Sequence, residues 1–447
     1  MDTPRQYEQK KAVLVQQLRT IKGDIRLRKK TSNLFRSRSD GKQKINVRSF
    51  NQVINVDTKK EICEVEGMTT YAGLVQETLK YGYMPTVVPE LKSITIGGAF
   101  TGIGIESSSF RYGLVHETIE EAEVLLGNGE VVTCNKEKNK DLFFGFPNSY
   151  GTLGYALKIK VKIVPVKKYV KVQHQKYSNA QEYFSALADV CKKRTVDFAD
   201  GVIFNVNEMY LTTGKFVDHA PFTSKYTFMG IYYQSIRRKK EDYLAVKDYI
   251  WRWDPDWFWC SKHFKMQNKL VRFLFGKFLL RSTAYWKIMF WNRKYQLTEK
   301  MGKWVGKREY NESVIQDVEI PIEHCMEFID FFHKEVKIKP VWVCPLQTYN
   351  QKKIYPLYGM NPKKSYINFG FWDTVKVHAD TPVGFINKKI EKKVQELGGK
   401  KSLYSDVYYK KDVFWRLYNK KAYDALKKRY DPQGRLRNLY EKCVLKA

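Results

Sequence analysis

The apolar residues of the first 165 positions alternate between helical and strand-like spacing. Residues 6–20 and 71–81 have the helical spacing, and Gly82 is suited to end the second helix. Short runs of alternating apolar and polar residues predict strands at 52–57, 63–66, 120–126, 130–134 and 157–164. Asn128 and Gly129 form a favoured dipeptide for a tight turn between two of these strands. The pattern therefore predicts a mixed α+β domain.

The pattern changes at about residue 167, where aromatic residues and lysines become more frequent and glycines fewer. Residues 319–336 predict a strand followed by an amphipathic helix, and residues 339–345 and 365–370 predict further strands. A second domain is therefore expected to begin near this point.

Residues 249–293 are unusually rich in both aromatic and basic side chains. The segment contains YIWRWDPDWFWC and then KLVRFLFGKFLLRSTAYWKIMFWNRK, in which apolar and cationic residues alternate at helical spacing. This pattern is typical of a helix that lies in a membrane interface. It is equally typical of a helix that packs its apolar face on the protein while its lysine stems cover the rim. The sequence leaves both interpretations open.

Composition limits the protein class. A chain of 447 residues with 43% hydrophobic residues is long enough for two or three folded domains and is not disordered. The net charge of +32 raises nucleic acid and an anionic membrane as partners. Because no zinc-finger, helix-turn-helix or RNP-type signature is present, specific nucleic-acid binding is not expected. A generally lysine-rich composition is the third explanation of this charge.

The seven cysteines are scattered without a C-x-x-C pair, and the seven histidines form no H-x-x-x-H pair. Reduced thiols in a cytoplasmic setting are expected, and neither structural zinc nor metal catalysis is. The first twenty residues lack the apolar core of a signal peptide, and no run approaches the ~20 apolar residues of a spanning helix. We therefore expect a cytoplasmic protein with at most peripheral membrane contact.

Residues 94–113, ITIGGAFTGIGIESSSFRYG, combine five glycines with three consecutive serines. Glycines allow close backbone approach, and together with hydroxyls they form a wall of donors suited to a pyrophosphate. The alternative is a glycine-rich turn without a ligand. The spacing differs from the G-x-G-x-x-G fingerprint, which opens a helix. Because no helical pattern follows, we expect this run to be a loop.

The run PELKSITIGGAFTGIGIESSSFRYGL resembles the second flavin-contacting segment of FAD enzymes with the PCMH-type (vanillyl-alcohol-oxidase-like) domain, most closely the delta-24 sterol reductases and their bacterial relatives. RLRKKTSNLFR (residues 26–36) resembles the pyrophosphate loop of that domain. KPVWVCPL, YSDVYYKKDVFW and YDPQGRLRNLYEKC resemble later parts of the reductases. The likeness implies a two-lobed PCMH-type FAD-binding domain at 1–166, an α+β cap domain at 167–400, and a carboxyl-terminal segment at 401–447 that returns to the first domain.

The resemblance also implies which residues bind FAD. The pyrophosphate loop would contribute Thr31, Ser32 and Asn33, with Arg36 as a charge partner. The opposing wall would consist of Thr95, Ile96, Gly97, Gly98, Ala99, Phe100, Thr101, Gly102, Ile103, Gly104, Ile105, Glu106 and Ser107. Gly151 and Gly154 would lie on the adenine side. The pyrophosphate loop has no histidine for a covalent bond, and His116 is expected to cap or pack, so the FAD is expected to be non-covalent.

The implied activity is reduction of an isolated C=C bond in a sterol-like or isoprenoid lipid, with NADPH or NADH as electron donor. An acid must protonate the second alkene carbon. By analogy with the family, Tyr404, Asp406 and Tyr408 are the expected group, with Glu106 as a further candidate. Two alternatives remain: a PCMH-type alcohol or sugar oxidase or dehydrogenase, and a basic scaffold without catalysis.

Overall fold

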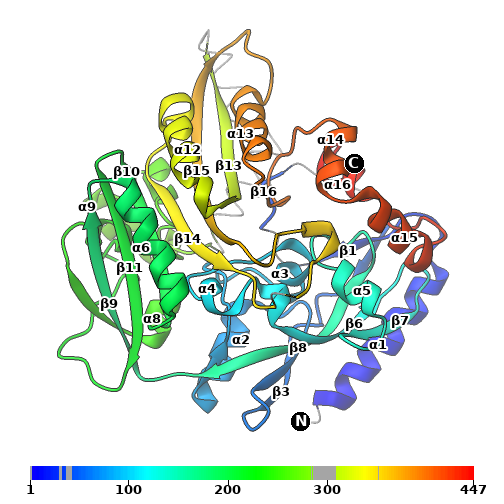
Figure 1. The fold of residues 1–447 in the computed structure, drawn as a ribbon. Helices are drawn as coiled ribbons and strands as arrows, with labels where there is room; N and C mark the ends of the chain where they lie inside the picture. The colour runs from blue at the N-terminus through cyan, green and yellow to red at the C-terminus, as the bar shows by residue number, and fades with distance from the viewer. Residues whose placement is uncertain are drawn as a thin grey trace.

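The computed structural model describes residues 3–29, 33–36, 43–282, 284, 309–350 and 352–446, and contains two antiparallel sheets with helices around them (Figure 1). A short parallel pair, β1 (Arg26–Arg28) and β2 (Lys44–Asn46), lies outside both sheets. The α+β class predicted from the sequence is confirmed.

The first sheet has the strand order β3-β4-β8-β6-β7, and β5 pairs with β8. Its strands are β3 (Val53–Asp57), β4 (Ile62–Glu66), β5 (Tyr83–Pro85), β6 (Ile119–Leu125), β7 (Val131–Asn135) and β8 (Tyr155–Pro165). Strand β8 buries Ile159, Val161 and Ile163 on one face. On the other face its intervening lysines form ion pairs with neighbouring strands, among them Lys158 with Glu64 at 3.1 Å. The period-two alternation of the sequence thus separates a core face from an ion-paired face.

Helix α1 (Thr3–Thr20) covers the ion-paired face of this sheet. Its Tyr7 is buried there and donates a hydrogen bond of 2.9 Å from its hydroxyl to Glu123 Oε2. The remaining helices of the first part are α2 (Tyr71–Thr78), η1 (Leu79–Tyr81), α3 (Ile96–Gly102), α4 (Ser109–Tyr112), η2 (Val115–Thr118) and α5 (Lys140–Gly145). The helices predicted at 6–20 and 71–81 and the five predicted strands are therefore all present.

The second sheet has the order β12-β9-β11-β10-β14-β15-β13-β16. Its strands are β9 (Tyr169–Tyr177), β10 (Phe198–Asn205), β11 (Glu208–Val217), β12 (Glu241–Ala245), β13 (Glu309–Pro321), β14 (Val341–Gln347), β15 (Ser365–His378) and β16 (Lys400–Lys401). Three helices, α6 (Ala180–Lys193), α12 (Cys325–Phe331) and α13 (Phe385–Glu396), pack on one face and can be followed in Figure 1. In β14, Val341 and Val343 face these helices, while Trp342 faces the opposite side and belongs to the core that also contains the first sheet.

The other helices of the described residues are short. They are α7 (Tyr232–Ser235), α8 (Val246–Ile250), η3 (Cys260–Phe264), α9 (Lys269–Leu279), η4 (Ile322–His324), η5 (Phe332–Val336), η6 (Pro356–Tyr358), α14 (Lys411–Leu417), α15 (Lys420–Tyr430) and α16 (Leu439–Cys443). No helix among the described residues is both long and apolar enough to cross a membrane.

The expectation that residues 94–113 form a loop is wrong. Thr95 caps helix α3 by accepting a hydrogen bond from Gly98 N at 3.2 Å, and α4 follows at Ser109. Glycine is a poor helix former, so the sequence pattern argued against a helix here. The glycines are used instead for packing, because a Cβ at Gly97 would lie 2.6 Å from the carbonyl oxygen of Gly67.

The aromatic part of the 249–293 segment is interior. The side chains of Tyr249, Trp251, Trp253, Trp257, Phe258 and Trp259 are all buried. For these residues the membrane-interface interpretation is wrong, because they fill the core between the second sheet and the first domain. Trp286 and Trp291, which belong to the same prediction, lie outside the described residues.

The carboxyl-terminal segment packs on the first domain. In Figure 1, α15 lies beside α5 and near α1. Arg435 Nη2 donates to Leu18 O at 3.4 Å, and Lys442 Nζ donates to Tyr150 O at 2.6 Å. Phe35 forms an isolated parallel bridge with Ser405. The two sheets divide near residue 167, while the domain boundaries at 166 and 400 stay predictions.

Candidate functional site

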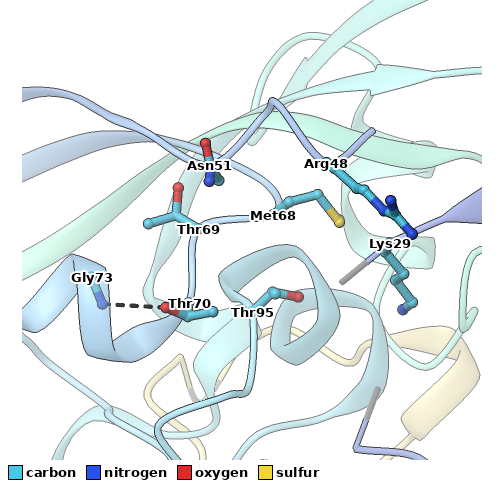
Figure 2. A pocket seen from close by; sticks show the side chains of 8 residues that line it. All are labelled: Lys29, Arg48, Asn51, Met68, Thr69, Thr70, Gly73 and Thr95. Carbon is cyan, nitrogen blue, oxygen red and sulfur yellow. Dashed lines mark hydrogen bonds between the residues drawn. The ribbon is translucent and has the colours of Figure 1, made fainter. Parts of the chain in front are cut away.

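A small pocket lined mostly by polar residues lies where the predicted pyrophosphate loop meets the start of α3. It has a volume of about 120 Å³ and is lined by Lys29, Arg48, Asn51, Met68, Thr69, Thr70, Gly73 and Thr95. Figure 2 shows Arg48 and Lys29 on one side and the three threonines around the remainder. Thr70 caps α2 and Thr95 caps α3, so the amino-terminal ends of two helices meet at this pocket.

The chemistry of this pocket suits a phosphate-bearing ligand. Arg48 Nε is buried and has no hydrogen-bond partner in the described part of the chain. Two cationic side chains and several hydroxyls surround the space, and helix amino termini favour negative charge. A typical pocket for a whole ligand measures about 300–1,000 Å³. The residues therefore fit the diphosphate part of a dinucleotide.

The backbone amides of the α3 first turn are already bonded within the protein. Ile96 N donates to Thr69 O at 3.0 Å and Gly97 N donates to Gly67 O at 2.9 Å. The Gly98 amide is held by the Thr95 cap. Side chains rather than these three amides are thus the groups that face a ligand here.

The rest of the predicted glycine wall connects α3 to its neighbours. Ile96, Ala99 and Phe100 are buried in the first core, and the Thr101 hydroxyl donates to Gly97 O at 3.0 Å. Gly102 O accepts a hydrogen bond of 2.9 Å from the Tyr150 hydroxyl. Ile103, with φ of 60°, ends the helix in a left-handed conformation that is strained for a β-branched residue.

The remaining part of this wall joins the two domains. Ile105 is half-buried, and Gly104 O accepts from Val115 N at 2.9 Å. Ala199 N in β10 donates to Ser107 O at 2.8 Å, and the Ser107 hydroxyl lies 3.4 Å from the Tyr249 hydroxyl. The serine run, predicted as a cofactor wall, is thus placed against the second sheet.

Two other predicted groups, Gly151 with Gly154 and His116, are buried in the first domain. Gly151 and Gly154 have positive φ, in the turn that leads into β8. A Cβ at Gly154 would lie 2.8 Å from Leu125 O, so glycine is needed there for packing on β6. His116 is buried, its pKa is lowered to about 3 by burial, and its ring packs against Tyr355 at 4.2 Å. Packing is the role expected for this histidine.

The described part of the pyrophosphate loop runs from this pocket to the carboxyl-terminal segment. Asn33 Oδ1 accepts a hydrogen bond of 2.9 Å from the Ser93 hydroxyl, just before α3. Arg36 is buried and donates through Nε to Leu403 O at 3.2 Å and through Nη1 to Lys442 O at 2.5 Å. Thr31 and Ser32, the other predicted loop residues, lie outside the described residues.

Tyr404 lies at the meeting point of this loop and the second sheet. Phe35 N donates to Tyr404 O at 2.8 Å, and the two rings pack edge to face at 5.8 Å. The Tyr404 hydroxyl donates to Asp317 Oδ2 at 2.7 Å and accepts from Trp372 Nε1 at 3.0 Å. Trp257 contacts Phe35 from the other side at 5.2 Å. Three distant segments thus form one aromatic site around a tyrosine–carboxylate pair.

Burial sets the protonation of this pair. Burial, followed by the nearby Asp317, raises the pKa of Tyr404 well above its usual value. Burial raises the pKa of Asp317 from 3.8 to about 6, although the hydrogen bonds from Asn368 and Tyr404 oppose the rise. Gly370 leaves space for this carboxylate, since a Cβ there would lie 2.8 Å from Asp317 Oδ1. Tyr404 therefore keeps its proton through neutral pH, as a proton donor must.

Asp406 and Tyr408, predicted with Tyr404, are placed on a different side of the segment. Asp406 Oδ1 lies 3.0 Å from Lys446 Nζ. Tyr408 N donates to both carboxylate oxygens of Glu391 in α13, at 3.0 and 3.2 Å. The structure does not bring these two residues together with Tyr404.

Glu106 belongs to a buried charge cluster between the two domains, the Arg252 cluster, formed by Arg252, Glu90, Glu106 and Asp200. Arg252 Nη1 lies 2.8 Å from Glu90 Oε1, while its Nη2 lies 2.8 Å from Asp200 Oδ2 and 3.3 Å from Glu106 Oε1. Burial raises the pKa of both Glu90 and Glu106, against the opposing effect of the arginine. Because the cluster has one cation for three carboxyl groups, repulsion between the carboxylates favours the protonated form of a glutamic acid.

The sequence reasoning missed Arg48, Asp317 and Trp372. Arg48 stands alone in a segment without a recognised motif. Asp317 was detectable, since it interrupts the apolar positions of VIQDVEIP, and a carboxylate inside a buried strand marks a polar site. The described residues include no cluster of three or more His, Cys, Asp or Glu side chains suited to a metal ion.

Comparisons with known proteins find similarity over the first domain and over most of the chain. A family described as FAD binding domain matches residues 3–135. The Delta(24)-sterol reductase of Homo sapiens is 27% identical over 408 residues, covering 88% of this chain and 76% of that protein. The Delta(24)-sterol reductase homolog of Caenorhabditis elegans is 27% identical and covers 83% and 73%. The Delta(24)-sterol reductase of Arabidopsis thaliana is 24% identical and covers 89% and 76%. The predicted resemblance is confirmed.

Proposed function

We propose that this protein is an FAD-dependent reductase of an isolated C=C bond. The premises are the FAD-binding domain and the likeness to Delta(24)-sterol reductases over most of the chain. Its substrate would be the side chain of a sterol-like or isoprenoid lipid. The extent of the likeness carries this proposal. A similarity covering 88% of the chain extends far beyond residue 135, so it includes most of the second sheet and not only the cofactor domain.

The pocket between the two helix ends would hold the FAD diphosphate. Arg48 and Lys29 would offset its charge, and the hydroxyls of Thr70 and Thr95, which among the described residues only accept hydrogen bonds from helix amides, would donate to it. The predicted loop residues Thr31, Ser32 and Asn33 adjoin this pocket in sequence and would complete it. Non-covalent binding is proposed because neither the loop sequence nor the pocket lining includes a histidine.

Tyr404 would supply the proton. When bound, FAD supplies a two-electron carrier that accepts hydride from reduced nicotinamide and delivers it to an alkene carbon. The opposite alkene carbon then needs a proton. Asp317 and Trp372 fix the orientation of the Tyr404 hydroxyl, and the Phe35, Trp257 and Trp372 rings provide an apolar surface beside it. Asp406 and Tyr408 would act only by supporting the segment.

The electron donor and the location belong to the same proposal. NADPH or NADH would reach the site through the substrate cleft, because the sequence has no separate nicotinamide-binding fingerprint. The protein would work in the cytoplasm, as expected from the sequence. Because a lipid substrate resides in a bilayer, the protein would also contact membranes peripherally.

The test begins with the visible spectrum of the purified full chain, before and after addition of FAD. The flavin is then reduced anaerobically with NADPH, with NADH in parallel, and mixed with a sterol that has an unsaturated side chain. We expect reoxidation with recovery of the saturated product, and no reoxidation by the saturated sterol. Reoxidation by oxygen or a quinone alone would favour an alcohol or sugar oxidase instead. A protein that stays colourless with FAD would favour the non-catalytic scaffold.

A further inference from the structure

Helix α9 exposes a continuous apolar surface. The exposed fractions are 67% for Leu270, 63% for Phe273, 55% for Leu274, 52% for Phe275 and 68% for Phe278. No other helix in the described ranges exposes more than one large apolar side chain. Residues 270, 274 and 278 follow each other at intervals of one helical turn, and residue 273 lies beside them. These five residues, the α9 face, are an outlier on a protein surface.

The charge around the α9 face has one sign. Lys269 and Lys277 are exposed on the helix, and Lys265 and Arg281 are exposed just beyond its two ends. The sequence contains no aspartate or glutamate from residue 257 to residue 298. A surface of this kind is complementary to a bilayer with anionic lipid headgroups over an apolar interior. Each basic residue near the headgroups contributes roughly 1 kcal/mol to the free energy of binding.

The opposite side of α9 is fixed to the protein. The Arg272 guanidinium is buried and bonds both Asp256 carboxylate oxygens, at 2.7 and 2.8 Å, and Gly230 O at 3.0 Å. Asn268 caps the helix by accepting from Leu270 N and Val271 N. Gly276 allows close approach, because a Cβ there would lie 3.1 Å from the Phe228 ring. The apolar side chains are therefore held outward by a rigid anchor.

We propose that the α9 face is the site at which this protein docks on an anionic lipid bilayer. The anchor also connects this face to the candidate active site. Asp256, which holds Arg272, directly precedes Trp257, and Trp257 contacts Phe35 beside Tyr404. A bilayer at the α9 face would thus be linked to the aromatic site through one run of buried contacts. The inference deepens the proposed function, but its test does not depend on catalysis.

The test is co-sedimentation of the full chain with vesicles of phosphatidylcholine alone or of phosphatidylcholine with 30% phosphatidylglycerol, across a salt series. We expect binding to the anionic vesicles that weakens as salt rises. The double variant Phe273→Ser/Phe278→Ser is expected to lose at least tenfold in affinity. The matched control is Val383→Ser/Phe385→Ser, which removes two exposed apolar residues at the start of α13 and should bind like the unaltered chain.

The proposal is overturned if the α9 variant binds as well as the unaltered chain while both keep the same unfolding temperature. It is also overturned if light scattering shows a dimer that the α9 variant alone dissociates, since a second copy would then cover this face. Lys269→Glu/Lys277→Glu is a second probe and should abolish the salt-sensitive part of binding. A protein that binds vesicles but reduces no alkene would retain this inference and contradict the proposed function.

Discussion

At the scale of single residues, the Tyr404–Asp317 pair is the most specific feature of the candidate site. The two side chains come from the carboxyl-terminal segment and from β13, and they share one hydrogen bond of 2.7 Å. Trp372 holds the same hydroxyl from a third element, β15. A hydroxyl with two fixed partners has one orientation: its proton points to Asp317, so transfer to a substrate carbon would require the hydroxyl to turn from that carboxylate.

Replacing Tyr404 with phenylalanine should separate the two half-reactions. We expect Tyr404→Phe to slow reoxidation of the flavin by the alkene by about 10²–10⁴-fold, because the proton donor is lost. Reduction of the flavin by NADPH should change by less than about twofold, since it needs no such donor. Anaerobic stopped-flow measurement of each half-reaction tests this. Tyr408→Phe is the control, and equal effects of both variants would contradict the assignment.

Asp317 should make folding stability depend on pH. Its pKa is raised by burial from 3.8 to about 6, so the folded protein holds this proton more tightly than the unfolded chain. The resulting stabilisation is complete below about pH 4 and is lost as pH rises through 6. Asp317→Asn should remove about 3 kcal/mol of this dependence.

The measurement is urea unfolding of both proteins between pH 4 and pH 8. The free energy of unfolding of the variant should increase relative to that of the unaltered chain as pH rises. If the free energies of unfolding of the two proteins change in parallel with pH over the whole range, Asp317 is charged to the same degree in the folded and unfolded states.

At the scale of elements, the sequence was sufficient wherever the apolar pattern had a simple period. Helix α1 and strands β3, β4, β6, β7 and β8 follow from such patterns. Helix α3 did not, because Gly97 and Gly98 have poor helix propensity and their role is visible only in three dimensions. The backbone of Gly97 contacts the backbone of Gly67, which is distant in sequence. Tertiary packing thus overrides local propensity.

The candidate site shows the same limit. Asn33, Thr95 and Tyr404 could be proposed from segments that resemble a known family. Arg48 could not, because it lies in no recognisable motif and acquires its surroundings from the meeting of two helix ends. Asp317 was visible as an interruption of an apolar strand pattern, but its partners come from strand pairing. Their chemistry depends on burial, which one sequence does not give directly.

Helix α3 allows a sharp comparison of two neighbouring glycines. Gly97→Ala should destabilise the protein by about 2 kcal/mol or more, because its Cβ would meet the Gly67 backbone at 2.6 Å. Gly98→Ala should change stability by less than about 1 kcal/mol, because the gain in helix propensity offsets contact with the Thr95 side chain. Equilibrium unfolding tests both. Equal effects would show that α3 does not pack on Gly67 as described.

At the scale of the whole molecule, the Arg252 cluster connects the two domains. Glu90 and Glu106 come from the first domain, whereas Asp200 comes from β10 of the second. Trp253 Nε1 and Trp342 Nε1 also donate to Asp200 Oδ2, at 3.3 and 3.2 Å. The junction is therefore a buried polar network inside an apolar core, and its parts depend on each other.

Removing the arginine should be costly. Arg252→Met leaves three buried carboxyls without a cation, and we expect a loss of about 3–5 kcal/mol in the free energy of unfolding. Arg237→Met is the matched control: Arg237 also bonds a carboxylate, that of Glu208, but its side chain is 53% exposed, so its loss should stay below about 1 kcal/mol. Denaturant unfolding gives both values. A small effect of Arg252→Met would mean that the junction does not depend on this charge.

The bridge between Phe35 and Ser405 has a consequence for biosynthesis. Phe35 receives this partner only from a segment that is made much later along the chain. A nascent polypeptide still attached to the ribosome can assemble its first sheet, but that edge stays open until Ser405 has left the ribosome. A product that ends before Ser405 would leave this edge exposed to chaperones.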